Sequence, residues 1–371
     1  MISLNKDTDF IFNKIQKGER ITEEEALYLL ENEELLNIGT IANYVRAKKH
    51  PDNIVTFVVD RNINYTNVCV AGCKFCAFQR RKSDSDAYVL DFDEIYRKIQ
   101  ELVDWGGTTL LMQGGLNPDL RLDFYVELFK GIKERFPQIH IHSLSATEIN
   151  YISKLEKISI EETLKILKDA GLDSLPGGGA EILSDEVRVL ISSNKTTTDQ
   201  WLEVHETAHK LGMKSTATMM FGHVEKPKHI IEHLSNIRKL QDRSLENHKG
   251  YFTAFIPWTF QKGGTKLDFL EPATSVWYLK VLAVSRIFLD NFDNVQTSHV
   301  TQTMKVGPVG LHFGANDLGS TMIEENVVTS TGLPVSYPKP EKMAKIIKEA
   351  GFIPAQRDTY YNIVRYFDDI S

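Results

Sequence analysis

The chain has 371 residues, of which 42% are hydrophobic and 25% are charged, and its formal net charge is −7. This composition predicts a globular protein with a large core, and no apolar run approaches the 18 residues of a membrane-spanning helix. The negative charge and the absence of a basic stripe exclude a broad nucleic-acid-binding surface. The start of the chain does not resemble a secretion signal, which predicts a cytoplasmic location.

Residues 1–50 are predicted to form a helical segment that precedes the catalytic domain. Thr22 and Glu25 have the spacing of a capping box, in which each residue satisfies a free backbone N–H group at the start of a helix. Apolar residues at helical spacing follow directly, namely Ala26, Leu27, Leu29 and Leu30.

From residue 54 onward, short apolar runs alternate with amphipathic helices, which predicts a (β/α)8 TIM-type barrel over residues 51–330. Strands are expected at 54–64, 108–113, 140–145, 174–176, 215–221, 251–256, 294–298 and 310–315. Helices are expected at 90–105, 121–136, 159–170, 184–192, 199–211, 228–243, 274–291 and 320–328. A partial barrel of six strands is the alternative. Residues 331–371 are predicted to be a C-terminal extension with a helix at 339–350 and a strand at 352–357.

The chain contains three cysteines, Cys69, Cys73 and Cys76, and they lie within eight positions. The spacing CxxxCxxC suits three irons of a 4Fe-4S cluster, and the fourth iron then stays open to a small molecule. A zinc site would need a fourth ligand, and the nearest histidine in sequence is His50. Disulfide bonding would leave one thiol over. The aromatic Phe75 could shield such a cluster, although an aromatic side chain there could equally be ordinary packing.

The loops that follow the strands are the expected place for chemistry, because barrel active sites lie at the carboxyl ends of the strands. Two glycine-rich segments stand there, at 113–115 and 177–179, where the backbone could lie against a cofactor or simply turn. His223 follows the fifth strand, although a lone histidine is more often structural. Further polar residues after strands are Ser145, Glu181, Asp317 and Glu324. Glu324 is a candidate for chemistry, although a carboxylate at the start of a helix often does no more than complement the helix dipole.

Several long segments resemble a known family. The stretch CVAGCKFCAF, together with QGG after the second strand, is similar to the radical S-adenosylmethionine (SAM) superfamily. The segments GGGAEILSDEVR, TATMMFGHVE, FIPWTFQ and GANDLGSTMIEENVV resemble the cyclic dehypoxanthine futalosine synthase family of menaquinone biosynthesis. The likeness runs from about residue 20 to the C-terminus.

The resemblance implies a radical cyclase with a 4Fe-4S cluster and SAM as cofactors. A 5′-deoxyadenosyl radical would take a hydrogen from the 4′ carbon of the ribose of dehypoxanthine futalosine. The resulting sugar radical would add to the benzoate ring, and loss of an electron and a proton would restore aromaticity. A reductant such as flavodoxin or ferredoxin is the implied partner. Two related families are the alternatives: the deazaflavin-cofactor (FO) synthase subunit that couples tyrosine to 5-amino-6-ribitylaminouracil, and aminofutalosine synthase.

The resemblance also implies roles for particular residues. The three cysteines would be the cluster ligands. Cofactor-binding residues would be Phe75, Gln113, Gly114, Gly115, Ser145, Glu181 and Arg188. The Glu181 carboxylate and the Arg188 guanidinium suit the ribose hydroxyls and the methionine carboxylate of SAM. The final deprotonation needs a base, for which the candidates are His223, Asp317 and Glu324.

Overall fold

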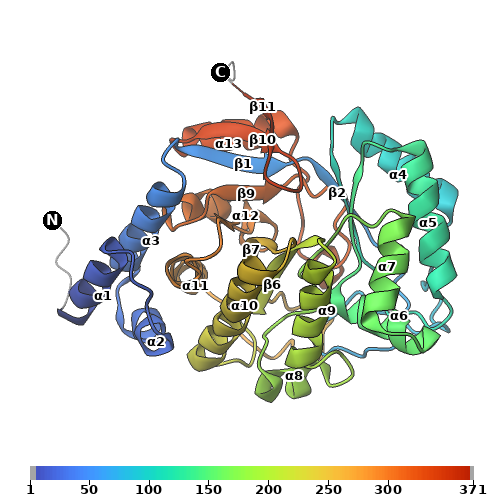
Figure 1. Cartoon of the computed structure of the whole chain (residues 1–371), viewed down its shortest axis with the longest axis horizontal. Helices are drawn as coiled ribbons and strands as arrows, with labels where there is room; N and C mark the ends of the chain where they lie inside the picture. The colour runs from blue at the N-terminus through green and yellow to red at the C-terminus, as the bar shows by residue number, and fades with distance from the viewer. Residues whose placement is uncertain (1–5, 368–371) are drawn as a thin grey trace.

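The computed structural model describes residues 6–367, and a ring of parallel strands lies at its centre (Figure 1). Seven strands are neighbours in one sheet, in the order β2 (Asp60–Ile63), β3 (Thr109–Met112), β4 (His140–Ser143), β5 (Ser174–Leu175), β6 (Lys214–Phe221), β7 (Phe252–Thr259) and β8 (Asn294–Val295). A second sheet contains β1 (Ile54–Val58), which leads into β2, and β9 (Asp317–Ser320). β9 pairs with β1, and a bridge between Gln296 and Asp317 joins it to the strand that precedes it. The predicted α/β barrel is confirmed.

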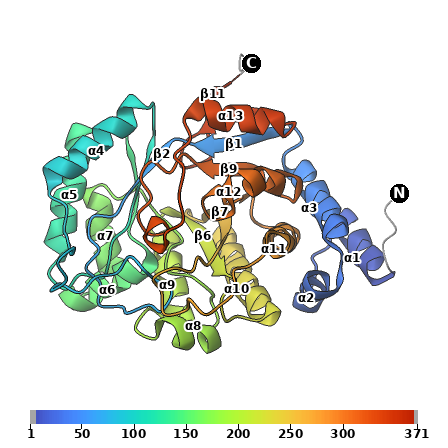
Figure 2. The same cartoon turned by 180° about the vertical axis from the view of Figure 1, so that it is seen from behind.

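Helices cover the outside of this ring, as Figure 1 and Figure 2 show from opposite sides. Glycines at the predicted helix ends adopt the left-handed backbone conformation that ends a helix, with φ of 71° at Gly106 and 79° at Gly212. The helices after β2 are α4 (Phe92–Asp104), α5 (Leu122–Arg135), α6 (Ala146–Glu156), α7 (Ile160–Ala170), α8 (Asp185–Ser192), α9 (Thr198–Lys210), α10 (Pro227–Asn247), α11 (Ser275–Phe288) and α12 (His299–Val306). No helix within residues 6–367 is long and apolar enough to cross a membrane.

The N-terminal segment forms three helices, α1 (Lys6–Gln16), α2 (Glu23–Asn32) and α3 (Leu35–Lys49). The predicted capping box is present, because the Thr22 side chain accepts from the Glu25 N–H group and the Glu25 side chain accepts from the Thr22 N–H group. Leu29 and Leu30 are fully buried. The second and third helices pack on α10 and α11, so this segment supports the wall of the barrel formed by β6–β8 (Figure 1).

The C-terminal extension joins the sheet that contains β1. After α13 (Pro340–Glu349), strand β10 (Ile353–Arg357) pairs parallel with β1, and β11 (Ile363–Tyr366) pairs antiparallel with β10. The segment that follows β10 reaches the barrel interior, where the Thr359 hydroxyl lies 2.7 Å from that of Thr109 in β3. The extension therefore closes one end of the barrel.

Two predicted elements near the end of the barrel are wrong. The segment 310–315, predicted as the eighth strand, begins in the 3-10 helix η1 (Gly307–His312) and continues as a turn, and the strand is instead β9. The helix predicted at 320–328 is absent from the described chain, because Met322 and Glu324 have positive φ angles of 45° and 66° that a helix does not allow. Three elements were not predicted: α6, α12 and β11.

Candidate active site

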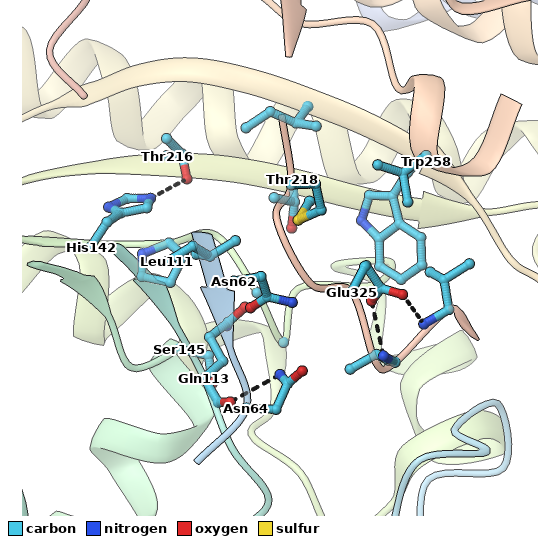
Figure 3. A pocket seen from close by; sticks show the side chains of 18 of the residues that line it. Asn62, Asn64, Leu111, Gln113, His142, Ser145, Thr216, Thr218, Trp258 and Glu325 are labelled. Atoms are coloured by element: carbon cyan, nitrogen blue, oxygen red, sulfur yellow. Dashed lines mark hydrogen bonds between the residues drawn. The ribbon is translucent and has the colours of Figure 1, made fainter. Parts of the chain in front are cut away.

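A cavity of about 400 Å³ occupies the centre of the ring of strands. The cysteine loop after β2 lines one end of it, and residues after β10 line the other end. Between them, side chains from β2, β3, β4, β6 and β7 and from the loops that follow the strands project inward, and Figure 3 labels ten of the lining residues.

The three cysteines all line this cavity and pack with Ala71 and Leu116. Backbone contacts hold their loop, since the Lys74 N–H group donates to the Ile191 carbonyl oxygen at 2.8 Å. The Gln79 amide donates to the carbonyl oxygens of Cys73 and Cys76 at 2.8 and 3.3 Å. The loop thus aims three sulfur atoms at one region of the cavity.

The environment of the thiols fits an iron–sulfur cluster. Burial raises the pKa of Cys73 to about 12 and raises that of Cys76 as well. Such buried thiols ionise when a cation replaces the proton, which is what binding to iron does. Among residues 6–367, no three His, Cys, Asp or Glu side chains gather tightly enough to hold a single metal ion. A cubic cluster does not require the three sulfur atoms to converge on one ion, because each thiolate binds a different iron.

The glycines at 113–115 lie against the cysteine loop. A Cβ atom on Gly115 would lie 2.2 Å from the Val68 carbonyl oxygen and 2.8 Å from the Cys69 Cβ atom, so this position requires glycine. Gly114 donates its N–H group to Glu148 at 2.9 Å, and its own Cβ would meet the Tyr65 ring at 2.5 Å. Backbone therefore forms the wall beside the predicted cluster.

The second glycine-rich segment, at 177–179, faces the first. A Cβ on Gly178 would lie 2.2 Å from the amide nitrogen of Gln113, so the absence of a side chain there leaves room for that amide. The segment leads into Glu181, whose φ of 42° is unusual for a residue other than glycine. Such strained backbone is often found at functional sites.

Glu181 and Lys195 form a buried ion pair beside Phe75. The Lys195 ammonium lies 2.5 Å from one Glu181 carboxylate oxygen and 5.5 Å from the centre of the Phe75 ring. Burial opposes the charge on Lys195, but attraction to Glu181 outweighs it and raises the lysine pKa. The second oxygen of Glu181 is buried without a partner among the described residues. A buried acceptor that lacks a donor is suited to receive one from a ligand.

Arg188 does not line the cavity. Its guanidinium is buried and donates to the backbone carbonyl oxygens of Gly179, Ala180 and Thr196. It therefore holds the glycine-rich segment that carries Glu181 in place. Ser145 lines the cavity and caps α6, where its hydroxyl donates to Glu148 at 2.6 Å.

None of the three predicted bases is among the described residues that line the cavity. The ring nitrogens of His223 lie 3.2 Å from the Met220 carbonyl oxygen and 3.1 Å from Glu225. Asp317 is paired with Arg357 at 2.5 Å. Glu324 is paired with Arg61 at 2.7 Å and with Lys98 at 2.5 Å. Each of these side chains is held by its partners outside the cavity lining, and its role as a base stays a prediction.

The middle of the cavity is lined by uncharged hydrogen-bonding groups that were not predicted. They project from β2, β4 and β6 (Figure 3): Asn62, Asn64, His142, Thr216 and Thr218. Burial lowers the pKa of His142 to about 3, so its ring is neutral, and it lies 2.6 Å from the Ser174 hydroxyl. The alternation of polar residues along 60–64 within a predicted strand was the available signal for the first two.

The far end of the cavity is more strongly polar. Asp60 at the start of β2 and Arg357 at the end of β10 both line it. Tyr361 also lines it, and its ring centre lies 3.9 Å from the Arg357 guanidinium carbon. We call these residues, together with Thr109 and Thr359, the cavity floor.

Comparison with known proteins shows the family of this chain. Residues 63–237 match the radical SAM superfamily, and residues 248–370 match the CofH/MqnC C-terminal region. A cyclic dehypoxanthine futalosine synthase from Halalkalibacterium halodurans is 46% identical over 97% of this chain and 96% of its own. One from Streptomyces coelicolor is 42% identical over 98% of this chain and 90% of its own.

Other relatives are named for different activities. A 5-amino-6-(D-ribitylamino)uracil–L-tyrosine 4-hydroxyphenyl transferase from Methanothermobacter thermautotrophicus is 40% identical over 92% of this chain and 94% of its own. Among solved structures, methylornithine synthase has a TM-score of 0.73 at 18% identity and covers 93% of this chain and 97% of its own. That likeness supports the fold alone. The chain is a radical SAM enzyme, and it belongs to the cyclic dehypoxanthine futalosine synthase family.

Proposed function

We propose that this enzyme converts dehypoxanthine futalosine into its cyclic form, a step of menaquinone biosynthesis. The observation that carries the proposal is the layering of the cavity. A cysteine loop lies at one end, uncharged hydrogen-bonding groups lie in the middle, and a guanidinium lies at the floor. A substrate bound with its ribose next to the cofactor and its benzoate beyond would match this order.

The cofactors of the proposal are a 4Fe-4S cluster and SAM. Cys69, Cys73 and Cys76 would hold the cluster, and the close approach of Gly115 to their loop supports SAM beside it. The chemistry that these groups supply when bound is removal of a hydrogen atom from the substrate. The electron that starts it would come from a reductant such as flavodoxin or ferredoxin.

Four groups of the chain support SAM binding. The unpartnered oxygen of Glu181 can accept from a hydroxyl or ammonium group, and Phe75 can stack on adenine. The backbone at Gly114 and the Gln113 side chain border the same space. Arg188 acts on the position of Glu181, because it bonds to the carbonyl oxygens just before that residue.

The ribose of the substrate would lie among Asn62, Asn64, Thr216 and Thr218, whose amides and hydroxyls can exchange hydrogen bonds with sugar hydroxyls. Its benzoate would face Arg357, the one arginine among the described residues that line the cavity. Arg80 and Lys305 are poorer partners for the benzoate. Neither side chain is among the described residues that line the cavity, whereas Arg357 is.

The related transferase and aminofutalosine synthase are the competing activities. Anaerobically reconstituted enzyme should be incubated with SAM, a reductant and the substrates of each activity in separate reactions. Cyclisation predicts free 5′-deoxyadenosine and a product two mass units lighter than dehypoxanthine futalosine. Coupling of tyrosine to the ribityl uracil, or a product that contains the adenosyl group, would assign the chain to one of the competitors.

A further inference from the structure

Asp60 is a buried carboxyl group in the cavity floor that the proposed function leaves unused. It is the first residue of β2 and is 4% exposed. A carboxylate enclosed among strands is costly unless it is hydrogen-bonded or paired with a charge, so its presence needs a reason. It pairs with Thr109 of β3, and Asn62, two residues further along β2, pairs with Leu111.

The contacts of Asp60 hold the carboxyl group without neutralising it through a direct ion pair. One carboxylate oxygen accepts from the Met322 N–H group at 2.9 Å, and the Ser320 hydroxyl also bonds to the carboxyl group. Arg357 faces it from β10, but the guanidinium bonds to Asp317 instead, at 2.5 and 3.1 Å. Other titratable groups at this end are His142 in β4, His299 in α12 and Tyr361 after β10.

The balance of these contacts leaves a carboxyl group able to accept a proton near neutral pH. Burial raises the pKa of Asp60 to about 6, although the Met322 N–H group, the Ser320 hydroxyl and the charge of Arg357 act to lower it. The carboxylate form therefore predominates at pH 7.5. A base with such a pKa also binds the proton strongly enough to remove it from carbon in a transition state.

The position of Asp60 separates it from the cluster end of the cavity. Asn64 directly follows β2 and lies four residues after Asp60, which is about 13 Å of extended chain. The Asn64 amide bonds to the Gln113 carbonyl oxygen at 3.1 Å, so Asn64 lies at the level of the glycines that touch the cysteine loop. A substrate whose ribose lies beside Asn62 and Asn64 would place its aromatic ring beside the cavity floor.

We propose that Asp60 accepts the proton that leaves the aromatic ring after ring closure. This inference rests on the proposed cyclisation. The C–H bond at the newly joined ring carbon breaks, the proton goes to the Asp60 carboxylate, and both bonding electrons enter the ring. One electron then leaves to a one-electron acceptor of the iron–sulfur class, which restores the aromatic sextet.

The test is the yield of cyclised product per 5′-deoxyadenosine in Asp60→Asn, which keeps an oxygen to accept from the Met322 N–H group. We expect hydrogen abstraction to continue while this yield falls at least tenfold at pH 7.5. The matched control is Asp173→Asn, a carboxyl group outside the cavity lining that also accepts a backbone N–H bond, from Ile141 at 2.7 Å. That variant should keep the wild-type yield.

An unchanged yield in Asp60→Asn beside a normal wild-type reaction would overturn the role of Asp60 alone. Failure of the wild-type enzyme to cyclise this substrate would overturn the proposed function and this inference with it. The wild-type enzyme provides a second test if the variant does not fold. Its yield should fall as the pH drops through about 6, and a yield constant from pH 5 to 8 would contradict the proposal.

A readout without cofactors tests the same group. Infrared difference spectra between the wild type and Asp60→Asn should show a protonated carboxyl band at pH 5 that is lost by pH 8. A band already absent at pH 5, or one that persists at pH 8, would show that this side chain cannot act as the acceptor.

Discussion

The two ends of the cavity are built in different ways. The cluster end consists of one short loop, two glycine-rich segments and a single ion pair, so backbone and small residues dominate it. The floor consists of side chains from strands far apart in the chain, including Asp60 of β2 and Arg357 of β10. Under the proposed function, the cluster end would position a cofactor by close approach, whereas the floor would act on the substrate through charge and proton transfer.

The largest expected effect is loss of the cluster. Replacing Cys73 by Ala leaves two thiolates, which is too few for stable assembly, so we expect no visible iron–sulfur absorbance and no cleavage of SAM. Val70→Ala in the same loop, where the side chain is 51% exposed, is the control and should bind about four irons per chain. SAM cleavage in the cysteine variant would contradict the assignment of this end of the cavity as the cluster site.

Gly115→Ala tests close approach without removing a ligand. Its methyl group would lie 2.2 Å from the Val68 carbonyl oxygen, so the cysteine loop must move. A displacement of about 1 Å at a reacting centre lowers rates about a hundredfold, and we expect a loss of that size in SAM cleavage. Gly178→Ala is the comparison, because its methyl group meets the movable end of Gln113 and should reduce cleavage much less. Equal losses would show that backbone contact is not the deciding factor.

Lys195→Met tests the role of the Lys195–Glu181 ion pair at the cluster end. It leaves the Glu181 charge buried without its partner, which typically costs about 3–5 kcal/mol of folding free energy. Chemical denaturation should show this loss, and the double variant with Glu181→Gln should recover most of the stability while SAM binding stays impaired. Recovery of SAM binding as well would mean that the carboxylate is only structural.

The smallest expected effect is a gain in stability, rather than a loss, when Asp60 of the cavity floor is replaced. The rise of the Asp60 pKa from 3.8 to about 6 corresponds to about 3 kcal/mol of stability lost as the pH rises through this range. Asp60→Asn should therefore unfold at a higher temperature than the wild type at pH 7.5, and the difference should shrink at pH 5. A variant less stable at pH 7.5 would mean that the carboxylate is favourably paired.

The cluster end could be predicted from the sequence because its parts are contiguous. The spacing of Cys69, Cys73 and Cys76 and the glycines at 113–115 are local patterns with a direct chemical meaning. The barrel was predictable for a similar reason, since each strand and helix leaves a periodic pattern. The last strand was displaced by a few residues because the apolar segment near Leu311 reads as a strand, yet it lies in a 3-10 helix.

The floor could not be predicted because it depends on register between distant segments. Asp60 and Arg357 are about 300 positions apart, and only the parallel pairing of β10 with β1 brings them to one cavity. The three candidate bases followed predicted strands, but their neighbours neutralise them or hold them by hydrogen bonds. Such contacts between residues far apart in the chain cannot be recognised from a single sequence.

Transfer of an isotope from the substrate tests the central claim most directly. Dehypoxanthine futalosine that carries deuterium at the ribose 4′ carbon should be incubated with the reconstituted enzyme, SAM and a reductant. The account predicts one deuterium in the 5′-deoxyadenosine and none in the cyclised product, as measured by mass spectrometry. Unlabelled 5′-deoxyadenosine, or a product that retains both the deuterium and the adenosyl group, would contradict it.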